Sequence, residues 1–269
     1  MSDPDNALTE DVLRLARAGS VVRNDELDTR VVILAGGRGR RLEPYTSVLP
    51  KPLMPIGNRS ILEILVHQLT DAGLVNLTFC VGYLSHLIRA VFENGAKRNA
   101  RITWVKEPEP LGTAGPLRLV EGLDETFLVM NGDLLTTVDY RALLRHHRET
   151  GNVITIATHR RRVQIDYGVM HLDSENGSGR LVAFEEKPEM TWNVSMGIYV
   201  FEPAALELVP AEGAFDFPDL VCAALERGLA VGGFVHDGLW LDIGRHEDYE
   251  QAVALWARGE GMAEEPYGP

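Results

Sequence analysis

A loop rich in glycine and arginine follows the first strongly apolar stretch of the chain, residues 31–34. Arg38, Arg40 and Arg41 place three guanidinium groups within four residues, and such groups repel one another unless solvent or an anion screens them. Lys51 follows between two prolines, whose rings fix the backbone and remove two amide donors. In a chain with an excess of acidic residues, this concentration of cations favours a bound polyphosphate. The alternative is a surface loop whose lysine lies between prolines by chance.

The glycines of the loop, Gly36, Gly37 and Gly39, can bring backbone N–H groups close to phosphate oxygens. In an open α/β sheet the ligand lies beyond the carboxyl ends of the strands, where this loop is expected. The spacing differs from that of the dinucleotide-binding fingerprint, and the Gly-Lys-Ser/Thr ending of an NTPase loop is missing. Glycines alone are equally compatible with a tight turn that requires positive φ. The neighbouring arginines favour the phosphate.

Composition limits the kinds of protein that this chain can be. It has 269 residues, 45% of them hydrophobic, which is enough for a large α/β domain with a core. A net charge of −13 argues against binding to nucleic acid or to an anionic membrane. We expect no membrane span and no secretory leader. Cys80 and Cys222 lie in apolar stretches and are predicted to be buried free thiols, which indicates a reducing, cytoplasmic location.

Alternating strand and helix patterns occupy the first half of the chain. Short apolar runs predict buried strands at residues 31–34, 77–81, 102–105 and 127–130. Ser60 and Glu63 form a capping box that predicts a helix ending at Gly73, and further helices are predicted at residues 85–93, at residues 113–123 and after Asp139. Strands that alternate with helices imply right-handed crossovers. The sequence therefore predicts an α/β fold with a doubly wound, mainly parallel, Rossmann-like sheet.

The second half changes to short strands separated by glycine, asparagine and serine. Strands are predicted at residues 153–158, 167–172, 180–184 and 196–201, and helices at residues 218–227 and 247–256. These strands indicate a smaller antiparallel or mixed insertion built on the same core. We therefore expect an acidic N-terminal tail over residues 1–29 with a short amphipathic stretch at residues 8–18, one domain over residues 30–258, and a C-terminal tail over residues 259–269.

Seven motifs resemble those of the sugar-1-phosphate nucleotidylyltransferases. The loop and the lysine, LAGGRGRRL followed by PKPLMPI, are similar to the family signature L-x-G-G-x-G-T-R-L followed by P-K-P. The similarity continues, in the order of the family, through EPLGTAGPL, NGD, YGV, EEKP, NVSMGIYVF and WLDIGR, and spans roughly Arg30 to Trp256. The chain departs from the signature at Arg40, where the family has threonine, whereas Arg41 matches the family arginine.

The resemblance implies transfer of a nucleotidyl group from a nucleoside triphosphate to a sugar 1-phosphate, with release of pyrophosphate. Two anions must then meet, so positioning and charge neutralisation supply most of the catalysis and no general base is needed. The resemblance assigns catalytic roles to Arg41, Lys51 and Lys187. It assigns the nucleotide to Leu34, Ala35, Gly36, Gly37, Gly39, Arg41, Glu107, Gly112 and Thr113, and the sugar phosphate, in the insertion, to Gly168, Glu186, Lys187 and Asn193. Without the resemblance, the charged run at residues 185–187 is typical of a solvated strand end.

Two aspartates are the candidate metal ligands. Asp133 follows the strand predicted at residues 127–130, and Asp242 lies in WLDIG, more than a hundred residues later. Carboxylates at strand ends can converge on one hard cation, with phosphate oxygens and water completing the shell. The resemblance implies that both hold Mg²⁺. Taken singly, Asp133 is also a good turn residue, and Asp242 is also compatible with a surface position or a helix entry.

The base of the nucleotide is expected near Glu107, five residues before Gly112, where several relatives in the family carry glutamine. Guanine presents two adjacent donors, N1–H and the 2-amino group, and a carboxylate can accept both. Thymine and uracil present one imide donor between two acceptor oxygens, which a carboxylate repels. Glu107 thus favours GTP, with dTTP or UTP as the alternative if its side chain faces solvent.

Other features are left open or are expected to be structural. The sequence does not select the sugar, the pathway or the oligomeric state, and a homo-oligomer is one option. A binding-only homologue that senses a nucleotide-sugar is the alternative function, although the retained catalytic and metal-binding residues count against it. His146 and His147 are expected on a solvated helix face rather than at a zinc ion. Trp240 is expected to pack in the core near the site.

Overall fold

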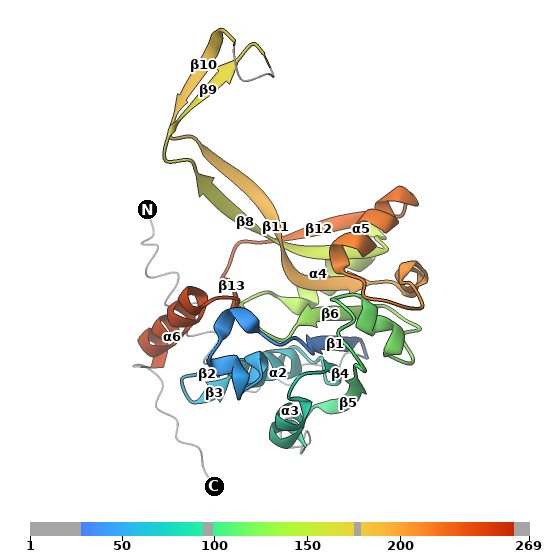
Figure 1. The fold of residues 1–269 in the computed structure, drawn as a ribbon. Helices are drawn as coiled ribbons and strands as arrows, with labels where there is room; N and C mark the ends of the chain where they lie inside the picture. Colours follow the sequence, from blue (N-terminus) through green and yellow to red (C-terminus); the bar gives the residue numbers. More distant parts are fainter. Residues whose placement is uncertain (1–27, 94–98, 175–178, 261–269) are drawn as a thin grey trace.

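The computed structural model describes residues 28–93, 99–174 and 179–260, so the amphipathic stretch expected at residues 8–18 lies outside the described residues. A seven-stranded sheet forms the centre of the body, in the order β12-β8-β11-β6-β1-β4-β5 (Figure 1). Its strands are β1 (Arg30–Ala35), β4 (Asn76–Val81), β5 (Arg101–Lys106), β6 (Phe127–Asn131), β8 (Ile154–Gln164), β11 (Glu189–Phe201) and β12 (Val231–His236). The apolar runs of the sequence thus form the strands of one sheet.

One half of this sheet is parallel, as the alternation of strands and helices predicts. β1 pairs in parallel with both β4 and β6, and β4 pairs in parallel with β5. β11 runs antiparallel between β6 and β8, and β12 continues the sheet parallel to β8. The predicted doubly wound, mainly parallel sheet is confirmed. The strands predicted at residues 153–158 and 196–201 are shorter than β8 and β11, because β8 continues out of the central sheet and β11 returns into it from outside.

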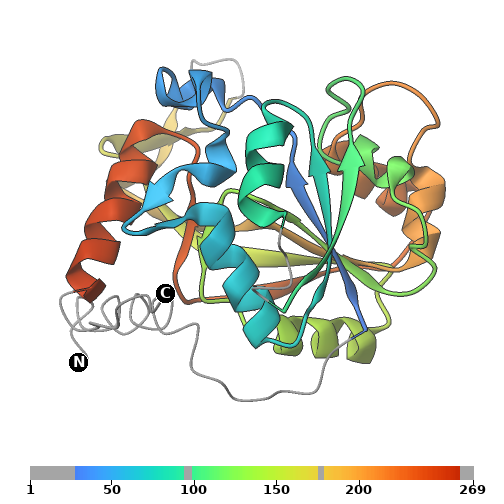
Figure 2. The same cartoon turned by 90° about the horizontal axis from the view of Figure 1, so that it is seen from below.

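Helices cover both faces of the sheet, as Figure 2 shows. Because successive side chains of a strand point to opposite faces, Ile33 belongs to one core and Val32 to the other. The first core also contains α2 (Ile61–Asp71), α3 (Ser85–Phe92) and α4 (Tyr140–Thr150), and the second contains α5 (Phe217–Glu226) with two 3₁₀ helices, η5 (Gly115–Leu119) and η6 (Pro203–Leu208). The capping box predicted for α2 is present, since Ser60 and Glu63 bond reciprocally, and Asp139 caps α4 as expected.

A third apolar cluster fixes the glycine-rich loop to the last helix of the described chain. α6 (His246–Glu260) contributes Ala252 and Trp256, and the 3₁₀ helix η1 (Arg40–Leu42) contributes the fully buried Leu42. Further short elements follow η1 along the chain: the 3₁₀ helices η2 (Tyr45–Ser47) and η3 (Lys51–Leu53), and the strands β2 (Pro55–Ile56) and β3 (Arg59–Ser60). Because a buried side chain anchors it, the arginine-rich loop has a fixed position.

The helix predicted at residues 113–123 is wrong, since only the short η5 forms there. Gly112, with a φ of +79°, lies directly before the predicted helix. The N–H groups of Ala114 and Gly115 both donate to the carbonyl of Phe215, each at 2.9 Å. These two N–H groups would lack a partner within a helix that starts at residue 113, so the pairing anchors the segment to a distant loop. The element ends early because Val120 has extended backbone, with a ψ of 114°.

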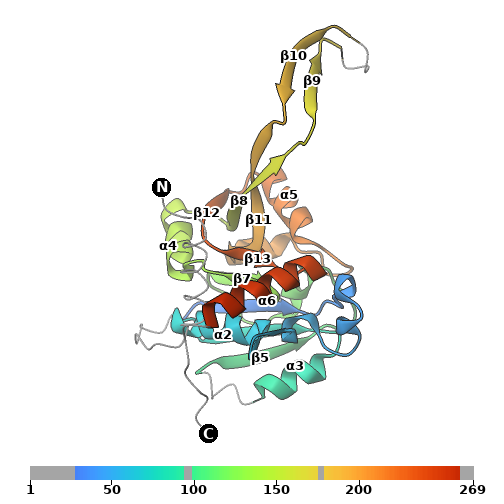
Figure 3. The ribbon, with the colours of Figure 1, turned by 90° about the vertical axis from the view of Figure 1, so that its left-hand side faces the viewer.

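A two-stranded ribbon projects from the body. β8 and β11 continue past the sheet and end in a hairpin of β9 (Gly168–Leu172) and β10 (Leu181–Glu186), which lies far from the body in two perpendicular views (Figures 1 and 3). A bulge separates the two parts of β11, because the register shifts between Ser195 and Tyr199 and Gly197 has a φ of +72°. We call residues 160–174 and 179–194 the arm.

Three side chains differ in part from expectation. Cys80 is buried as predicted, but Cys222 is exposed on the outer face of α5, since the buried residues of that helix are Phe217, Leu220 and Ala224. His147 is fully buried rather than solvated, because it continues the inward stripe of Tyr140, Leu143 and Leu144 on α4, whereas its neighbour His146 is partly buried. Within the described part of the chain, no helix has the length and apolar character needed to cross a membrane.

The His147 ring joins α4 to the sheet through two hydrogen bonds. One ring nitrogen, Nε2, lies 3.0 Å from Oε1 of Glu202, and the other, Nδ1, lies 2.8 Å from the hydroxyl of Thr155. A neutral ring satisfies both, with Nε2–H donating to the carboxylate and the hydroxyl donating to Nδ1. Burial lowers the pKa of His147 below its ordinary 6.5, although the Glu202 carboxylate acts in the opposite direction.

This burial predicts a dependence of stability on pH. The unfolded chain binds a proton at His147 near pH 6.5, whereas the folded chain does so only at lower pH, so stability is full above about pH 6.5 and falls as pH decreases. His147→Gln keeps hydrogen-bonding capacity without the titration. Urea unfolding at about pH 7.5 and about pH 5.5 should show a larger loss of stability for the wild type than for the variant. Equal losses in the two proteins would contradict the prediction.

Candidate active site

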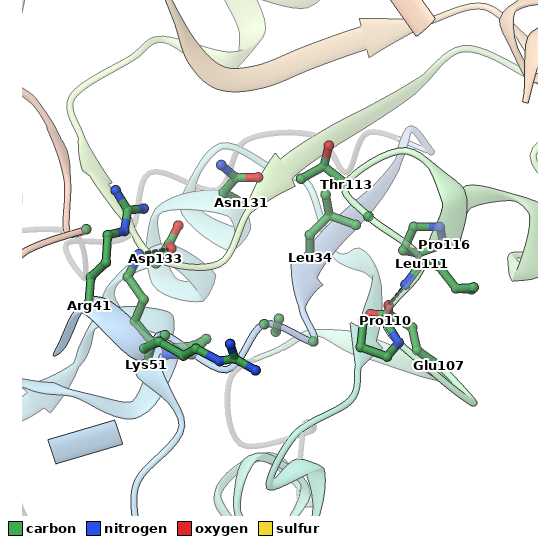
Figure 4. Close-up of a pocket in the computed structure, with 18 residues that line it drawn as sticks. Leu34, Arg41, Lys51, Glu107, Pro110, Leu111, Thr113, Pro116, Asn131 and Asp133 are labelled. Atoms are coloured by element: carbon green, nitrogen blue, oxygen red, sulfur yellow. Dashed lines mark hydrogen bonds and ion pairs between the residues drawn. The ribbon is translucent and has the colours of Figure 1, made fainter. Parts of the chain in front are cut away.

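An elongated cavity of about 440 Å³ opens beyond the carboxyl ends of β1 and β6 (Figure 4). Its lining includes every residue that the family resemblance assigns to the nucleotide: Leu34, Ala35, Gly36, Gly37, Gly39, Arg41, Glu107, Gly112 and Thr113. Lys51 and Asp133 line it as well. In Figure 4, Arg41, Lys51 and Asp133 stand at one end and Glu107 at the other. The cavity therefore has one end that carries Arg41, Lys51 and Asp133, which we call the charged end, and a second end that carries Glu107.

A buried lysine joins the two candidate metal ligands at the charged end. Nζ of Lys51 forms an ion pair with Oδ2 of Asp133 and lies 3.9 Å from Oδ1 of Asp242. Lys51 itself is only 9% exposed. Its position is fixed because η3 begins at Lys51 and includes the following proline. The structure thus brings together three residues that sequence reasoning placed in three separate motifs.

A short strand ladder explains why the two aspartates meet. β7 (Leu134–Thr136) pairs antiparallel with β13 (Trp240–Asp242), and the register places Asp242 opposite Leu134. The N–H of Ile243 also donates to the carbonyl of Asp133 at 3.2 Å. Asp242 belongs to this ladder and Asp133 directly precedes it, so backbone pairing holds their side chains near each other even though like charges repel.

The donor set at this end suits a hard divalent cation. Oδ1 of Asp133 is buried and has no hydrogen-bond partner among the described protein atoms. Burial, and then repulsion by Asp133, raises the pKa of the Asp242 carboxyl, while Lys51 and Arg41 act in the opposite direction. A cation bound here would coordinate the unpaired Oδ1 of Asp133 and offset the repulsion between the two carboxylates. The described residues hold no group of three or more metal-ligating side chains, so phosphate and water would have to complete the shell.

The three loop glycines serve different purposes. Gly39 has a φ of +63°, so the alternative of a tight turn applies to it. Gly36 lies against the Glu107 carboxylate, and a Cβ there would collide with it. Gly37 has no described atom within 4 Å of where its Cβ would be, which leaves its backbone open to the cavity. Glycine is thus needed for conformation at one position and for close approach at another.

The loop arginines separate rather than act as one cluster. Arg40 and Arg41 line the cavity, and the Arg41 guanidinium lies close to Gly244. Arg38 instead lies over the ring of Tyr83, with 5.5 Å between the guanidinium carbon and the ring centroid. Only two of the three arginines are therefore available to an anion in the cavity.

Glu107 forms the far end of the cavity, beside Leu111. Its carboxylate is half-buried, and Oε2 accepts a long hydrogen bond of 3.5 Å from the N–H of Leu111. Burial raises the pKa of Glu107, and the Leu111 N–H opposes that shift. Because one carboxylate oxygen contacts Gly36 and the other faces Leu111, the group is held in place rather than extended into solvent.

Asp216 is a site residue that sequence reasoning missed. Its Oδ1 accepts from the backbone N–H of Thr113 at 2.8 Å and from the Thr113 hydroxyl at 2.9 Å. The same hydroxyl accepts from the N–H of Phe217 at 2.9 Å. Asp216 occupies the N-cap position of α5 without capping it, because its oxygen is engaged with Thr113. An Asp-Phe-Pro helix start was visible in the sequence, but its partner was not.

The residues assigned to the sugar phosphate do not line this cavity. Gly168, Glu186, Lys187 and Asn193 are all exposed and all lie in the arm. Gly168 and Glu186 are register partners in the hairpin, and Lys187 follows it with a φ of +46°. In this arrangement the structure gathers the nucleotide and metal positions but holds the four arm positions apart from them.

A second cavity of about 460 Å³ adjoins the charged end on the side of the arm. It shares Arg41 and Gly244 with the first cavity, and Asp242 lines it. The other lining residues come from the base of the arm, β13 and α6: His159, Arg160, Arg161, Arg162, Trp240, Leu241, Arg245, Asp248 and Gln251. Trp240 packs against the core near the site as predicted, and its indole N–H donates to the carbonyl of Met196 at 3.1 Å. The two cavities therefore meet at Arg41 and Gly244, close to the aspartate pair.

Comparison with known proteins places the geometry in context. The family model for nucleotidyl transferase matches residues 30–258. The chain is 30% identical over 244 residues to the UTP–glucose-1-phosphate uridylyltransferase of Synechocystis sp., covering 83% of this chain and 62% of that protein. It is 31% identical over 234 residues to the mannose-1-phosphate guanyltransferase beta-B of Xenopus laevis, covering 84% of this chain and 64% of that protein. The chain thus spans less than two thirds of the length of these relatives.

A solved structure shows a similar fold over most of the chain. HddC from Yersinia pseudotuberculosis, crystallised in complex with GMP-PN, is 26% identical, with a TM-score of 0.63, and the match covers 84% of this chain and 98% of that chain. The fold described above is therefore similar to that of HddC over most of the chain.

The wall formed by Gly112 gives a graded test of the packing around the cavity. Ala at position 112 must adopt positive φ and also place its Cβ 2.6 Å from the carbonyl oxygen of Phe215. Gly151 has a similar φ of +64° but open space, and Gly37 has open space without that φ. Urea unfolding should show a loss of about 1–2 kcal/mol for Gly151→Ala, a larger loss for Gly112→Ala, and a change within about 0.5 kcal/mol for Gly37→Ala. Equal losses of stability for Gly112→Ala and Gly151→Ala would mean that the backbone at Phe215 moves away from the new Cβ.

Proposed function

The chain belongs to the nucleotidyl transferase family of sugar-1-phosphate nucleotidylyltransferases, and on that premise we propose that it transfers a nucleotidyl group, preferably from GTP, to a sugar 1-phosphate. The observation that carries this proposal is the charged end of the cavity. There, Lys51, Asp133 and Asp242 meet at the edge of a glycine loop that leaves backbone free for phosphates. We take residues 30–258 as the catalytic unit and residues 1–29 and 259–269 as tails.

The proposed reaction exchanges one P–O bond for another. An oxygen of the sugar phosphate attacks the α-phosphorus of the nucleotide, and the bond from that phosphorus to the bridging oxygen of pyrophosphate breaks. The attacking phosphate already carries negative charge, so no residue has to remove a proton. Pyrophosphate leaves with the electron pair. The task of the protein is to hold two anions in line and to neutralise charge.

Cationic side chains at the charged end suit that task. Arg41 lies between the two cavities and can contact phosphates from either side, whereas Lys51 is held within the carboxylate pair. We propose that Lys51 contacts the triphosphate and offsets charge on the departing pyrophosphate, as the family resemblance implies. Asp133 and Asp242 would hold Mg²⁺, which when bound supplies charge neutralisation at the phosphates. In the absence of substrate, the Lys51 ammonium keeps the two carboxylates from facing each other uncompensated.

The far end of the cavity supports a preference for guanine. Glu107 is half-buried with its carboxylate fixed between Gly36 and Leu111, so it can accept from both N1–H and the 2-amino group of guanine. The guanyltransferase relative and the complex of HddC with GMP-PN agree with that choice. The uridylyltransferase relative keeps UTP, and with it dTTP, as the second candidate.

The second cavity is where we place the acceptor. It opens onto Asp242 and Arg41 from the side opposite the base-binding end, so a sugar phosphate there would face the α-phosphorus rather than the base. Lys187 and the other arm positions remain our candidates for binding the sugar phosphate. The free thiols Cys80 and Cys222 are compatible with the cytoplasmic location that we propose.

The proposal is tested by pyrophosphate release. GTP, UTP, dTTP, CTP and ATP are each combined with a panel of sugar 1-phosphates, with Mg²⁺ and with EDTA. Release should be fastest with GTP, should need both substrates and should stop in EDTA, and Asp133→Asn should lower turnover by about a hundredfold or more. Tight binding of nucleotide-sugar without any release would instead favour the sensing homologue.

Glu107 gives the sharpest prediction for nucleotide choice. In Glu107→Gln the amide NH₂ must face one of the two guanine donors or rotate away, which leaves a buried donor unpaired. This should cost about 1–3 kcal/mol, roughly tenfold to over a hundredfold in kcat/KM for GTP. Activity with UTP or dTTP should fall less or rise, because the amide can donate to a pyrimidine carbonyl and accept from N3–H. Equal use of GTP and inosine triphosphate by the wild type would show that Glu107 does not contact the 2-amino group.

A further inference from the structure

The end of the nucleotide cavity that carries Glu107 is formed by an irregular segment. Residues 107–114 connect β5 to η5 and form neither helix nor strand. Besides Glu107, this segment supplies four residues to the lining: Pro110, Leu111, Gly112 and Thr113. In Figure 4, Pro110 and Leu111 stand next to Glu107. Because the segment lacks the hydrogen bonds of a regular element, contacts with other parts of the chain have to hold it in place.

The backbone of a second loop, residues 210–216, holds this segment. The N–H of Phe215 donates to the carbonyl of Leu111, and the Phe215 carbonyl accepts from the N–H groups of Ala114 and Gly115, all at 2.9 Å. The two backbones are also in direct contact, since a Cβ at Gly112 would lie 2.6 Å from the Phe215 carbonyl oxygen. Phe215 therefore fixes the cavity segment on both sides of Gly112.

The side chain of Asp216 reinforces this contact. Its Oδ1 accepts from the N–H and the hydroxyl of Thr113, at 2.8 and 2.9 Å, and that hydroxyl accepts from the N–H of Phe217 at 2.9 Å. Hydrogen bonds to a carboxylate are stronger than those between neutral groups. An aspartate at an N-cap position ordinarily bonds to the first turn of its own helix, but Asp216 makes no such bond to α5. Its carboxylate thus serves Thr113 and not its own helix.

The loop is itself anchored at both ends. Phe217, which directly follows Asp216, is buried in the second core, and its ring centroid lies 4.3 Å from that of Tyr199. Near the start of the loop, Nη1 of Arg118 donates to the carbonyls of Pro210 and Gly213, at 3.1 and 2.8 Å. Asp216 therefore lies in a loop with little freedom to move and can act as a fixed support for the cavity segment.

Leu111 connects this support to the carboxylate that we propose to select the base. Its carbonyl accepts from Phe215, and its N–H donates to Oε2 of Glu107 at 3.5 Å. Displacement of the loop would shift Leu111 and loosen the contact that holds Glu107. The charged end is built from other elements, η1, η3 and the ladder of β7 and β13. We therefore expect the loop to affect binding of the base and not binding of the phosphates.

We propose that Asp216 is a positioning residue for the nucleotide. It lines neither cavity, and it acts through Thr113 and the backbone around Gly112, which it holds where the base binds. The inference rests on the proposed function for the identity of the ligand, a nucleoside triphosphate. It adds to that function a residue that sets nucleotide affinity without contacting the nucleotide.

Calorimetric binding tests the inference without turnover. The probes, each with Mg²⁺, are the nucleoside triphosphate that the wild type binds most tightly, GTP by our proposal, and inorganic tripolyphosphate, which has no base. Asp216→Ala should weaken nucleotide binding about tenfold, the loss expected when one or two hydrogen bonds are removed, and should change tripolyphosphate binding by less than about twofold. Asp216→Asn keeps an oxygen acceptor for Thr113 and should bind the nucleotide within about threefold of the wild type.

Two further variants control for charge and for folding. Asp219→Ala removes the same charge from an exposed position in the first turn of α5 and should bind both probes like the wild type. Arg118→Met removes the other attachment of the loop and should also weaken nucleotide binding alone, and it decides the question if Asp216→Ala is unfolded at the assay temperature. In steady state, Asp216→Ala should raise KM for the nucleotide with kcat within about threefold, whereas a loss of folded protein would lower kcat alone.

Three results would overturn the inference: unchanged nucleotide binding by Asp216→Ala, equal weakening of both probes, or an Asp216→Asn variant no better than Asp216→Ala. The last result would mean that the charge of Asp216 acts and not its hydrogen bonds. A wild type that binds the nucleotide but releases no pyrophosphate would overturn the proposed function, while the binding comparison would still decide the inference. A wild type that binds no nucleoside triphosphate would overturn both.

Discussion

Two carboxylates from distant parts of the chain share one buried lysine, and the rest of the site is arranged around that charge balance. Asp133 raises the pKa of Asp242 by repulsion, and backbone pairing between β7 and β13 holds the two close together with Lys51 between them. Lys51 can stand between them because the residues on either side of it are prolines and because the loop that precedes it is anchored through Leu42. A buried charge pair of this kind is weak evidence for stability in itself. Its presence here agrees with our proposal that Asp133 and Asp242 hold Mg²⁺.

The cavity divides recognition between two ends. The charged end is built from side chains, whereas the middle is built from glycine backbone that leaves room for phosphates, and the far end is closed by Glu107. Glu107 and Gly36 depend on each other, since a side chain at position 36 would displace the carboxylate. The lack of a side chain at Gly36 therefore leaves room for the carboxylate that we propose to select the base.

Much of the fold was predictable because apolar runs and helical stripes report burial directly. β1, β4, β5 and β6 follow from such runs. The stripe on α4 also contained the signal for His147, which stands seven residues after Tyr140 and so on the same side of the helix. The helix expected at residues 113–123 could not be corrected from sequence, because the loop that anchors its first residues, at Phe215, lies about a hundred residues away. The extension of β8 into the arm was hidden because a run of arginines at residues 160–162 shows no alternation of polar and apolar residues.

The ladder between β7 and β13 also determines when the site can come into existence. Every strand of the seven-stranded sheet precedes β13 along the chain, so the sheet can assemble on the ribosome before Trp240–Asp242 has been synthesised. The ladder itself cannot form until the chain has been synthesised past Asp242, which places it late in folding. A nascent chain therefore holds the glycine loop, Lys51 and Asp133 but only half of the carboxylate pair. The complete site can therefore form only when synthesis of the domain is almost finished.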